Sequence, residues 1–409
     1  MHGSIGKSAY IIIALPATML ICRTVYPQKM PKAFYRAEAA LELNQTMDAL
    51  AWADSCFNAK PYRYQYYLIK GKALLQANRY SEAAEVFLQA EKQRAGIASY
   101  HLARTYCLIS DTINCIEWTR QNLQSIYREP ESSYLLNNDF KFAHSLKEWQ
   151  KIWDTEWYSS IERDIHYARY LISNQNYDEA IELLNKRIKS QRSKAELFEL
   201  RGRAHLHAGN FSLALKDFEN AYHRNKRNYG NLALQAEAQY NLNQNGKALN
   251  QIEQAINKSG GNPEYLRIKA KILSKLNRWS EAYETLKEYL EYYPNSTEAN
   301  ITLARCAYES GYYTDALLAI AKMLKFAPNN VELILLRGKI YLKTDQPRQA
   351  IIDFEKAISQ NYNTAESYLL KGLALLKEGE REEACKCFSI SGSLGNIDAQ
   401  GVFYNTCKR

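Results

Sequence analysis

The sequence is poor in the residues that interrupt helices, with 17 glycines and nine prolines among 409 residues. Turn-rich β architectures need many of both, so this scarcity favours helices. The chain also lacks any CxxC pair. Its eight cysteines are too few for a disulfide scaffold, and their spacings fit no zinc template. Apolar residues make up 46% of the chain, but a mean hydropathy of −0.48 excludes a protein with many membrane spans.

Catalytic motifs are missing as well: the chain contains no GxxxxGK[ST], no GxGxxG, no GxSxG and no HExxH. Cys385 and Cys387 form a CxC on one expected helix, which is poor geometry for a single metal ion. We therefore expect no enzyme activity, no cofactor, no metal and no small-molecule substrate.

The net charge of +9 is spread evenly along the chain. Basic residues outnumber acidic ones by 18 to 15 up to residue 160 and by 35 to 29 after it. A nucleic-acid-binding protein concentrates positive charge on one face, arm or tail. The even spread therefore predicts no nucleic-acid partner.

One long apolar run occurs, from Ala9 to Cys22, between Lys7 and Arg23. It is shorter than the roughly 20 residues of a spanning helix and resembles the core of a secretory signal. We predict that residues 1–28 form a signal peptide or an N-terminal membrane anchor. The protein would then be exported, either periplasmic or associated with an envelope membrane, where its cysteines can pair. The alternative is a buried first helix of a soluble, cytoplasmic fold.

The main positive feature is a strict internal repeat in the C-terminal half. An alanine recurs at every 34th position without a slip, at Ala180, Ala214, Ala248, Ala282, Ala316, Ala350 and Ala384. Twelve residues before each alanine stands another small residue: Ala168, Gly202, Ala236, Ala270, Ala304, Gly338 and Gly372. Four residues after it stands a large apolar one: Leu184, Phe218, Ile252, Leu286, Ile320, Phe354 and Phe388.

Each unit of the repeat contains two stretches with apolar residues at helical spacing, separated by a short breaker such as Gly209-Asn210. The paired small residues are expected where the two helices of a hairpin cross, because a larger side chain would overpack that contact. A single hairpin cannot bury its apolar face alone. Neighbouring hairpins are therefore expected to stack into a solenoid.

This pattern resembles the tetratricopeptide repeat family, and the units that begin at Ala195 and Val331 are good matches. Weaker units lie upstream, one around Gly71 and another around Ala37, and a third around Ala103 is displaced by two residues from the period. The resemblance, of a bacterial envelope type, implies an all-α solenoid of helical hairpins wound into a right-handed superhelix. It implies about ten repeats with one irregular segment between two arrays.

We divide the chain into five parts. Residues 1–28 are the signal or anchor, and residues 29–124 form about three degenerate units. Residues 125–160 form an irregular, Trp-rich connector, 161–395 form seven in-phase units, and 396–409 form a capping helix. The connector contains Trp149, Trp153 and Trp157. These rings either pack two arrays together or form an aromatic patch for a peptide or glycan.

In this family the first helix of each unit lines a concave groove, and positions 9 and 13 tend to face a ligand when the recurring alanine is numbered 20. The resemblance thus implies a broken cationic stripe that binds partners, formed by Arg169, Arg203, Lys271, Lys275, Arg305, Lys339 and Lys343. The alternative is that these cations pair with glutamates at position 2 of the same or adjacent units: Glu162, Glu196, Glu264, Glu298, Glu332 and Glu366.

The sequence therefore predicts a non-catalytic scaffold that binds protein partners in a concave groove in the cell envelope. The stripe suits acidic or extended partner segments, and the N-terminus would provide membrane association. An alternative of a different class is an envelope protein that binds glycans or surface ligands. The excess of 31 tyrosines and the cluster of tryptophans motivate that alternative.

Overall fold

The computed structural model describes residues 30–58, 62–191 and 193–408. Within these residues the chain forms 23 α-helices, three short 3-10 helices and no strand. The prediction of an all-α fold of helical hairpins is therefore confirmed. None of the helices in this described part combines the length and the apolar character that a bilayer span requires. The predicted signal or anchor lies outside the described residues.

The first three hairpins and the segment after them form the N-terminal array. Its elements are α1 (Lys32–Glu42), α2 (Thr46–Ser55), η1 (Cys56–Asn58), α3 (Tyr64–Gln76), α4 (Tyr80–Gln93), α5 (Ser99–Leu108), α6 (Thr112–Gln124), α7 (Glu131–Leu135), η2 (Asn138–Phe140), η3 (Ala143–Ser145) and α8 (Lys147–Ile152).

Seven further hairpins and a single final helix follow. They are α9 (Ser160–Ser173), α10 (Tyr177–Ser190), α11 (Ala195–His207), α12 (Phe211–Arg224), α13 (Gly230–Asn241), α14 (Asn245–Lys258), α15 (Glu264–Lys275), α16 (Trp279–Tyr292), α17 (Thr297–Glu309), α18 (Tyr313–Phe326), α19 (Val331–Lys343), α20 (Pro347–Ser359), α21 (Thr364–Glu378), α22 (Arg381–Ser393) and α23 (Ile397–Cys407).

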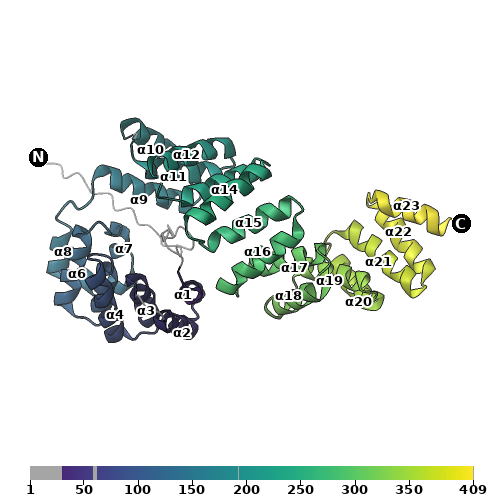
Figure 1. Cartoon of the computed structure of the whole chain (residues 1–409), viewed down its shortest axis with the longest axis horizontal. Coiled ribbons are helices and arrows are strands. Elements are labelled where there is room, and N and C mark those ends of the chain that lie inside the picture. The colour runs from purple at the N-terminus through teal and green to yellow at the C-terminus, as the bar shows by residue number, and fades with distance from the viewer. Residues whose placement is uncertain (1–29, 59–61, 192, 409) are drawn as a thin grey trace, which may run out of the picture. The chain divides into compact units, whose positions relative to one another are not determined.

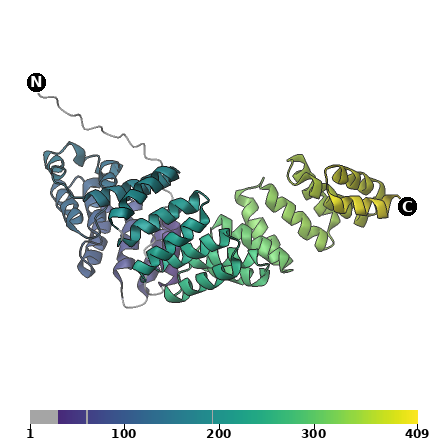
Figure 2. The ribbon, with the colours of Figure 1, turned by 90° about the horizontal axis from the view of Figure 1, so that it is seen from above.

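These helices belong to two compact units, which we describe separately. The N-terminal unit ends at Asn262 and the C-terminal unit begins at Pro263. Within each unit, the second helix of one hairpin contacts the first helix of the next, as α12 contacts α13 and α20 contacts α21. Figures 1 and 2 show these successive hairpins side by side.

The turn inside each hairpin places one residue in the left-handed backbone region. That residue recurs every 34 positions, at Gln175, Gly209, Asn243, Asn277, Gly311, Asp345 and Gly379. Glycine and asparagine adopt this conformation at low cost and end a helix there. In the third hairpin the same role falls to Ser110, two residues before the strict period would place it. This agrees with the displacement inferred around Ala103.

The predicted small residues lie where the two helices of a hairpin cross. A Cβ atom added to Gly202 or Gly338 would stand 2.6 or 2.7 Å from the ring of Phe218 or Phe354. The recurring alanines, among them Ala316, are fully buried. The repeat core therefore consists of this contact, made once in every hairpin.

The connector has a core of its own. Tyr134 and Phe140 are fully buried, and Trp149 is 2% exposed. The ring centroids of Phe140 and Trp149 lie 5.4 Å apart, and those of Tyr134 and Phe140 lie 5.3 Å apart. Aromatic contacts thus replace the small-residue crossing as the source of packing in α7, η2, η3 and α8.

The final helix, α23, packs on α22 as a cap. Ala399 is buried, and Val402, Phe403 and Cys407 pack against the core of the last hairpin. A disulfide links Cys407 to Cys385 of α22, with 5.8 Å between the Cα atoms. A second disulfide joins Cys107 to Cys115 across the turn between α5 and α6.

Candidate partner-binding surface

Within each unit, some first helices of successive hairpins contact one another, and we call the surface formed by the first helices of a unit its first-helix layer. In the N-terminal unit α1 contacts α3 and α9 contacts α11, and in the C-terminal unit α17 contacts α19 and α19 contacts α21. The candidate cations of positions 9 and 13 all lie on these first helices. The layer is therefore the surface on which the predicted stripe has to be assessed.

Three of the cations at position 9 form the same contact. Arg169 pairs with Glu196 at 2.5 Å, Lys339 pairs with Glu366 at 2.7 Å, and Arg305 pairs with Glu332. In each case the glutamate stands at position 2 of the next unit. Neighbouring repeats are thus joined by ion pairs in a fixed register. The pairing that the sequence left open occurs at these three positions.

Arg203 departs from this pattern for a reason visible in the sequence. Position 2 of the next unit is Gly230, which has no carboxylate to offer. Arg203 turns instead to Glu199, one turn earlier on its own helix, at 3.0 Å. Glu199 also accepts a hydrogen bond from Asn228 at 2.9 Å.

Glu298, at position 2 of its unit, pairs with Arg267 at 3.6 Å, and Arg267 stands at position 5 of the preceding unit. Lys271 stands at position 9 of its 34-residue unit, on α15, the first helix of the C-terminal unit.

The lysines of position 13 behave differently. Among the described residues, no hydrogen bond or ion pair engages Lys275 or Lys343. Their equivalent in the last unit, Lys377, does pair, with Asp345 at 2.7 Å. Lys275 and Lys343 therefore keep their ammonium groups available on the first-helix layer of the C-terminal unit.

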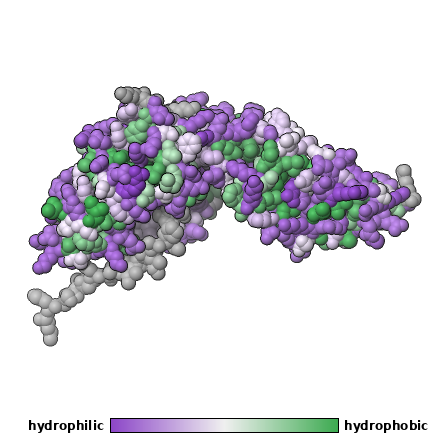
Figure 3. Space-filling view, turned by 90° about the horizontal axis from the view of Figure 1, so that it is seen from below, coloured by the Kyte–Doolittle hydropathy of each residue, from purple (hydrophilic) through white to green (hydrophobic). Residues whose placement is uncertain are grey.

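The ion pairs of the layer lie at the surface. The side chains of Arg305 and Glu332 are 53% and 41% exposed, and those of Lys339 and Glu366 are 25% and 40% exposed. Exposed pairs of this kind contribute about 0–1 kcal/mol each. A carboxylate brought by a partner can therefore replace the resident glutamate at little cost. Figure 3 shows one face of the molecule, where hydrophobic patches interrupt a mostly hydrophilic surface.

The three tryptophans of the connector do not share one environment. Trp149 belongs to the core, at 2% exposure. Trp153 and Trp157 are half-buried, and the indole Nε1 of Trp157 donates a hydrogen bond to the carbonyl of Ile152 at 2.8 Å. Of the three tryptophans, only Trp153 and Trp157 can therefore contribute to an aromatic surface, and Phe142 of the same segment is 39% exposed.

Two charged residues that sequence reasoning missed lie in the N-terminal unit. The side chain of Lys72 reaches solvent, yet desolvation by the surrounding protein lowers its pKa. Desolvation also raises the pKa of Glu129, against the effect of Lys72, Arg169 and Arg104. Both shifts have the same cause, because desolvation by the surrounding protein disfavours the charged form of each group.

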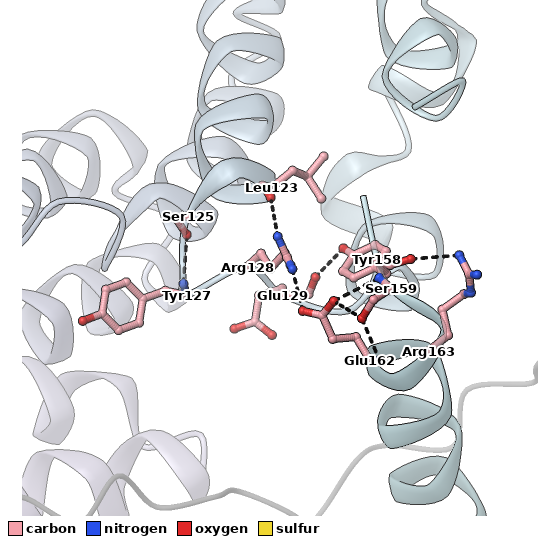
Figure 4. Close-up of polar contacts among 9 residues, drawn as sticks. All are labelled: Leu123, Ser125, Tyr127, Arg128, Glu129, Tyr158, Ser159, Glu162 and Arg163. Atoms are coloured by element: carbon pink, nitrogen blue, oxygen red, sulfur yellow. Dashed lines mark hydrogen bonds and ion pairs between the residues drawn. The ribbon is translucent and has the colours of Figure 1, made fainter. Parts of the chain in front are cut away.

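Neither the Lys72 ammonium nor the Glu129 carboxylate has a hydrogen-bond or ion-pair partner within the described residues. Figure 4 shows the Glu129 carboxylate apart from the contacts drawn there. A signal existed for Lys72, because it follows Gly71 as every position-9 residue follows its small residue. Glu129 lies in the connector, where the period gives no guidance.

Hydrogen bonds join the connector to α9 beside Glu129 (Figure 4). The hydroxyl of Tyr158 donates to the carbonyl of Glu129 at 2.5 Å, and Arg128 pairs with Glu162 at 2.5 Å. Glu162 also closes a capping box with Ser159 at the start of α9. Desolvation alone would raise the pKa of Glu162, but the bonds from Ser159 and Arg128 lower it to about 2. The connector is thus attached to the in-phase array at defined points.

Other kinds of site find little support. Over residues 30–58, 62–191 and 193–408, no group of three or more His, Cys, Asp and Glu side chains is placed to hold a metal ion. A shallow hollow of about 480 Å³ between α22 and α23 is lined by Cys385, Ile390 and Phe403 with three polar residues of α22. Its lining includes no histidine and only one carboxylate.

Taken together, stacked helical hairpins, a crossing contact once per repeat and a charged first-helix layer define a helical-repeat protein. Two family models, each described as tetratricopeptide repeat, match residues 273–340 in one case and residues 168–229 and 335–386 in the other. The chain is a tetratricopeptide repeat protein.

Several solved structures resemble parts of the chain. A tetratricopeptide repeat protein from Parabacteroides merdae is 20% identical and has a TM-score of 0.44, with 60% of this chain and 98% of that one covered. The C-terminal part of a repeat protein from Cytophaga hutchinsonii is 18% identical with a TM-score of 0.47, covering 58% and 98%. YrrB, described as having an unusual peptide-binding site, is 18% identical with a TM-score of 0.40, covering 48% and 97%. No curated protein gives a significant match.

Tetratricopeptide repeats generally form scaffolds for protein–protein interaction and are generally not catalytic. That general role, of binding protein partners, applies to this chain.

Proposed function

We propose that the protein is a non-catalytic scaffold of the cell envelope whose first-helix layer binds acidic segments of protein partners, either extended or helical. The observation that carries this proposal is the pair of unengaged lysines, Lys275 and Lys343, on a layer where Arg305 and Lys339 are held in partly exposed ion pairs.

The same layer offers apolar contacts between its charges. Leu342, Leu373 and Leu376 are half-buried on α19 and α21, at positions 12, 9 and 12 of their units. A partner segment that alternates acidic and apolar side chains can engage both kinds of group. Several weak contacts on one segment then add through effective concentration.

The location in the envelope has two independent supports. One is the apolar run from Ala9 to Cys22. The other is the pairing of Cys107 with Cys115 and of Cys385 with Cys407. Disulfides persist in oxidising compartments and are rare in the cytoplasm.

The lysines provide the test of the binding role. The tagged full-length protein is recovered with its partners from membrane and soluble fractions, beside the variant Lys275→Glu/Lys343→Glu. We expect that variant to lose its partners while its helical circular dichroism stays unchanged. Partner binding of the native protein should fall steeply with salt, because exposed charges are screened over about 8–10 Å at physiological ionic strength.

A matched control is Lys287→Glu/Lys386→Glu. These lysines lie on the second helices α16 and α22, with side chains 53% and 66% exposed, and the control makes the same change in net charge. It should retain the partners. Equal recovery with both double variants would show that the first-helix layer is only a solvated surface.

The location is tested separately. A reporter that is active only outside the cytoplasm, joined after Lys32, should be active. In cells quenched with a thiol reagent, the four cysteines of the two disulfides should resist labelling until a reductant is added. A silent, soluble reporter together with free thiols at Cys385 and Cys407 would disprove the envelope location and leave the binding role standing.

A further inference from the structure

The glycine in the middle of α23, Gly401, lies beside open space. A Cβ atom added to Gly401 would meet nothing within 4 Å, whereas one added to Gly338 would collide with Phe354. Glycine inside a helix costs about 1 kcal/mol relative to alanine. The open space beside Gly401 is the kind of surface to which another backbone can approach closely.

Gly401 lies at the centre of an exposed apolar stripe. Ile397 is 79% exposed and Tyr404 is 67% exposed, and residues four before and three after the glycine share its face of the helix. The opposite face, with Ala399, Val402 and Cys407, packs on α22. Lone exposed apolar residues are ordinary on a protein surface, but a stripe with a glycine at its centre is the pattern of a helix contact.

α23 is held on the last hairpin by its contact with α22. The end of the helix is fixed by the disulfide between Cys385 and Cys407 and by a hydrogen bond from Arg381 to the carbonyl of Thr406. The helix that carries the stripe is therefore fixed to its neighbour, and Figure 1 shows α23 beside α22.

The charges at the two ends of α23 indicate the occupant. Asp398 lies in the first turn, and Lys408 follows the last residue of the helix, with its ammonium 5.7 Å from the ring of Tyr404 on the same stripe. Two copies of α23 packed antiparallel bring the acidic end of each beside the basic end of the other. A parallel arrangement would place like charges together.

We propose that α23 is a self-association surface, at which two copies of the protein pack their α23 helices antiparallel with Gly401 of each copy at the crossing. Ile397 of one copy then lies against Tyr404 of the second copy, and the reverse contact follows from the two-fold symmetry. Both contacts use one patch that is complementary to itself.

The dimer is expected to be weak, because one pair of short helices buries less area than the standard interface of about 1,600 Å². The measurement is therefore sedimentation equilibrium of the full-length protein, with its disulfides intact, over a concentration series that reaches about 1 mM, where a free energy of about −4 kcal/mol is detectable. We expect the mean mass to rise from that of a monomer toward that of a dimer.

Variants of the stripe separate association from folding. Gly401→Ala should leave the melting temperature unchanged or higher, since the methyl group enters open space, but should weaken the dimer about tenfold or more by separating the helices. Ile397→Asp should abolish the dimer. The matched controls are Gly246→Ala, where a Cβ also meets nothing, and Ile352→Asp, on α20 at 65% exposure. Both should leave the dimer unchanged.

A charge reversal tests the orientation. Asp398→Lys should weaken the dimer, and Asp398→Lys/Lys408→Asp should restore it. A protein that stays monomeric over the whole series overturns the proposal, as does a dimer that tolerates both Ile397→Asp and Gly401→Ala. A dimer that the double reversal does not restore contradicts the antiparallel arrangement.

Discussion

At the scale of single residues, the crossing contact follows a rule that pairs glycine with phenylalanine and alanine with an aliphatic residue. Gly71, Gly202, Gly338 and Gly372 face phenylalanine rings at 2.4 to 2.7 Å from the Cβ position they lack. Among the seven in-phase units, those with alanine at the same position carry leucine or isoleucine opposite, as Ala168 does with Leu184. The two side chains share one fixed volume, so a larger side chain on one helix requires a smaller one on the other.

This rule predicts the outcome of a double-mutant cycle. Gly338→Ala should destabilise the protein by about 1–3 kcal/mol through overpacking against Phe354. Phe354→Leu alone should also destabilise it, by opening a cavity. The double variant should lose less free energy of unfolding than the two single variants together, by a coupling free energy of about 1 kcal/mol or more. Urea titrations of the four proteins measure these free energies.

Gly246→Ala is the control for the helix propensity of glycine, because its Cβ meets nothing. It should be neutral or stabilising by up to about 1 kcal/mol. Strict additivity of Gly338→Ala and Phe354→Leu would show that the two side chains do not compete for space.

At the scale of elements, the junction between the connector and α9 combines burial with titratable groups. The ring of His166 on α9 packs edge-on against Tyr158, with centroids 5.6 Å apart. Desolvation, assisted by the positive charge of Arg169, lowers the pKa of His166 to about 4. Arg128, Lys194 and Glu162 also act on this ring, and only Glu162 opposes the shift.

The junction should therefore be sensitive to acid. Above pH 6.5, the pKa of histidine in the unfolded state, His166 is neutral in both states and does not reduce the stability of the fold. Stability is lost as the pH falls from 6.5 toward 4, because the unfolded state then binds a proton that the folded state does not bind. Glu162, with its pKa lowered from 4.5 to about 2, adds a second loss between those two values. The protection of α8 and α9 against hydrogen exchange at pH 7, 5, 4 and about 2.5, corrected for the intrinsic exchange rate at each pH, reports both steps.

His166→Gln removes the group that titrates and should abolish the difference in protection against exchange between pH 7 and pH 5. His223→Gln, which changes an exposed histidine of α12, should keep that difference. Identical acid sensitivity in the two variants would assign the effect to other groups.

At the scale of the whole molecule, the predictable features are those that the period repeats. Seven turn residues and seven crossings recur in phase because each hairpin has the same turn and the same contact between its two helices. The ion pairs were predictable only as one of two alternatives, since the sequence places Arg305 and Glu332 in adjacent units without showing whether they meet. The link of Cys385 to Cys407 and the burial of Trp149 depend on how non-repeating segments fold back. A period carries no information about such segments.

The division into two compact units leads to a prediction about unfolding. Repeats contact mainly their neighbours, so the stability of a solenoid is a sum of local terms, and a destabilised unit can unfold before the rest. Gly202→Ala lies in the N-terminal unit and Gly338→Ala lies in the C-terminal unit, and each would place a Cβ within 2.7 Å of a phenylalanine ring. The two variants apply a closely matched perturbation on either side of the boundary after Asn262.

We expect two transitions in calorimetric melting, of which Gly202→Ala lowers one and Gly338→Ala lowers the other. Hydrogen exchange assigns them: Gly338→Ala should increase exchange in α17 to α22 and leave α1 to α8 unchanged, and Gly202→Ala should increase exchange only in the N-terminal unit. The physical reason is that a local overpacking costs free energy only in states where that contact is formed. A single transition that both variants shift equally would mean that the chain unfolds as one cooperative body, and that the boundary after Asn262 has no energetic meaning.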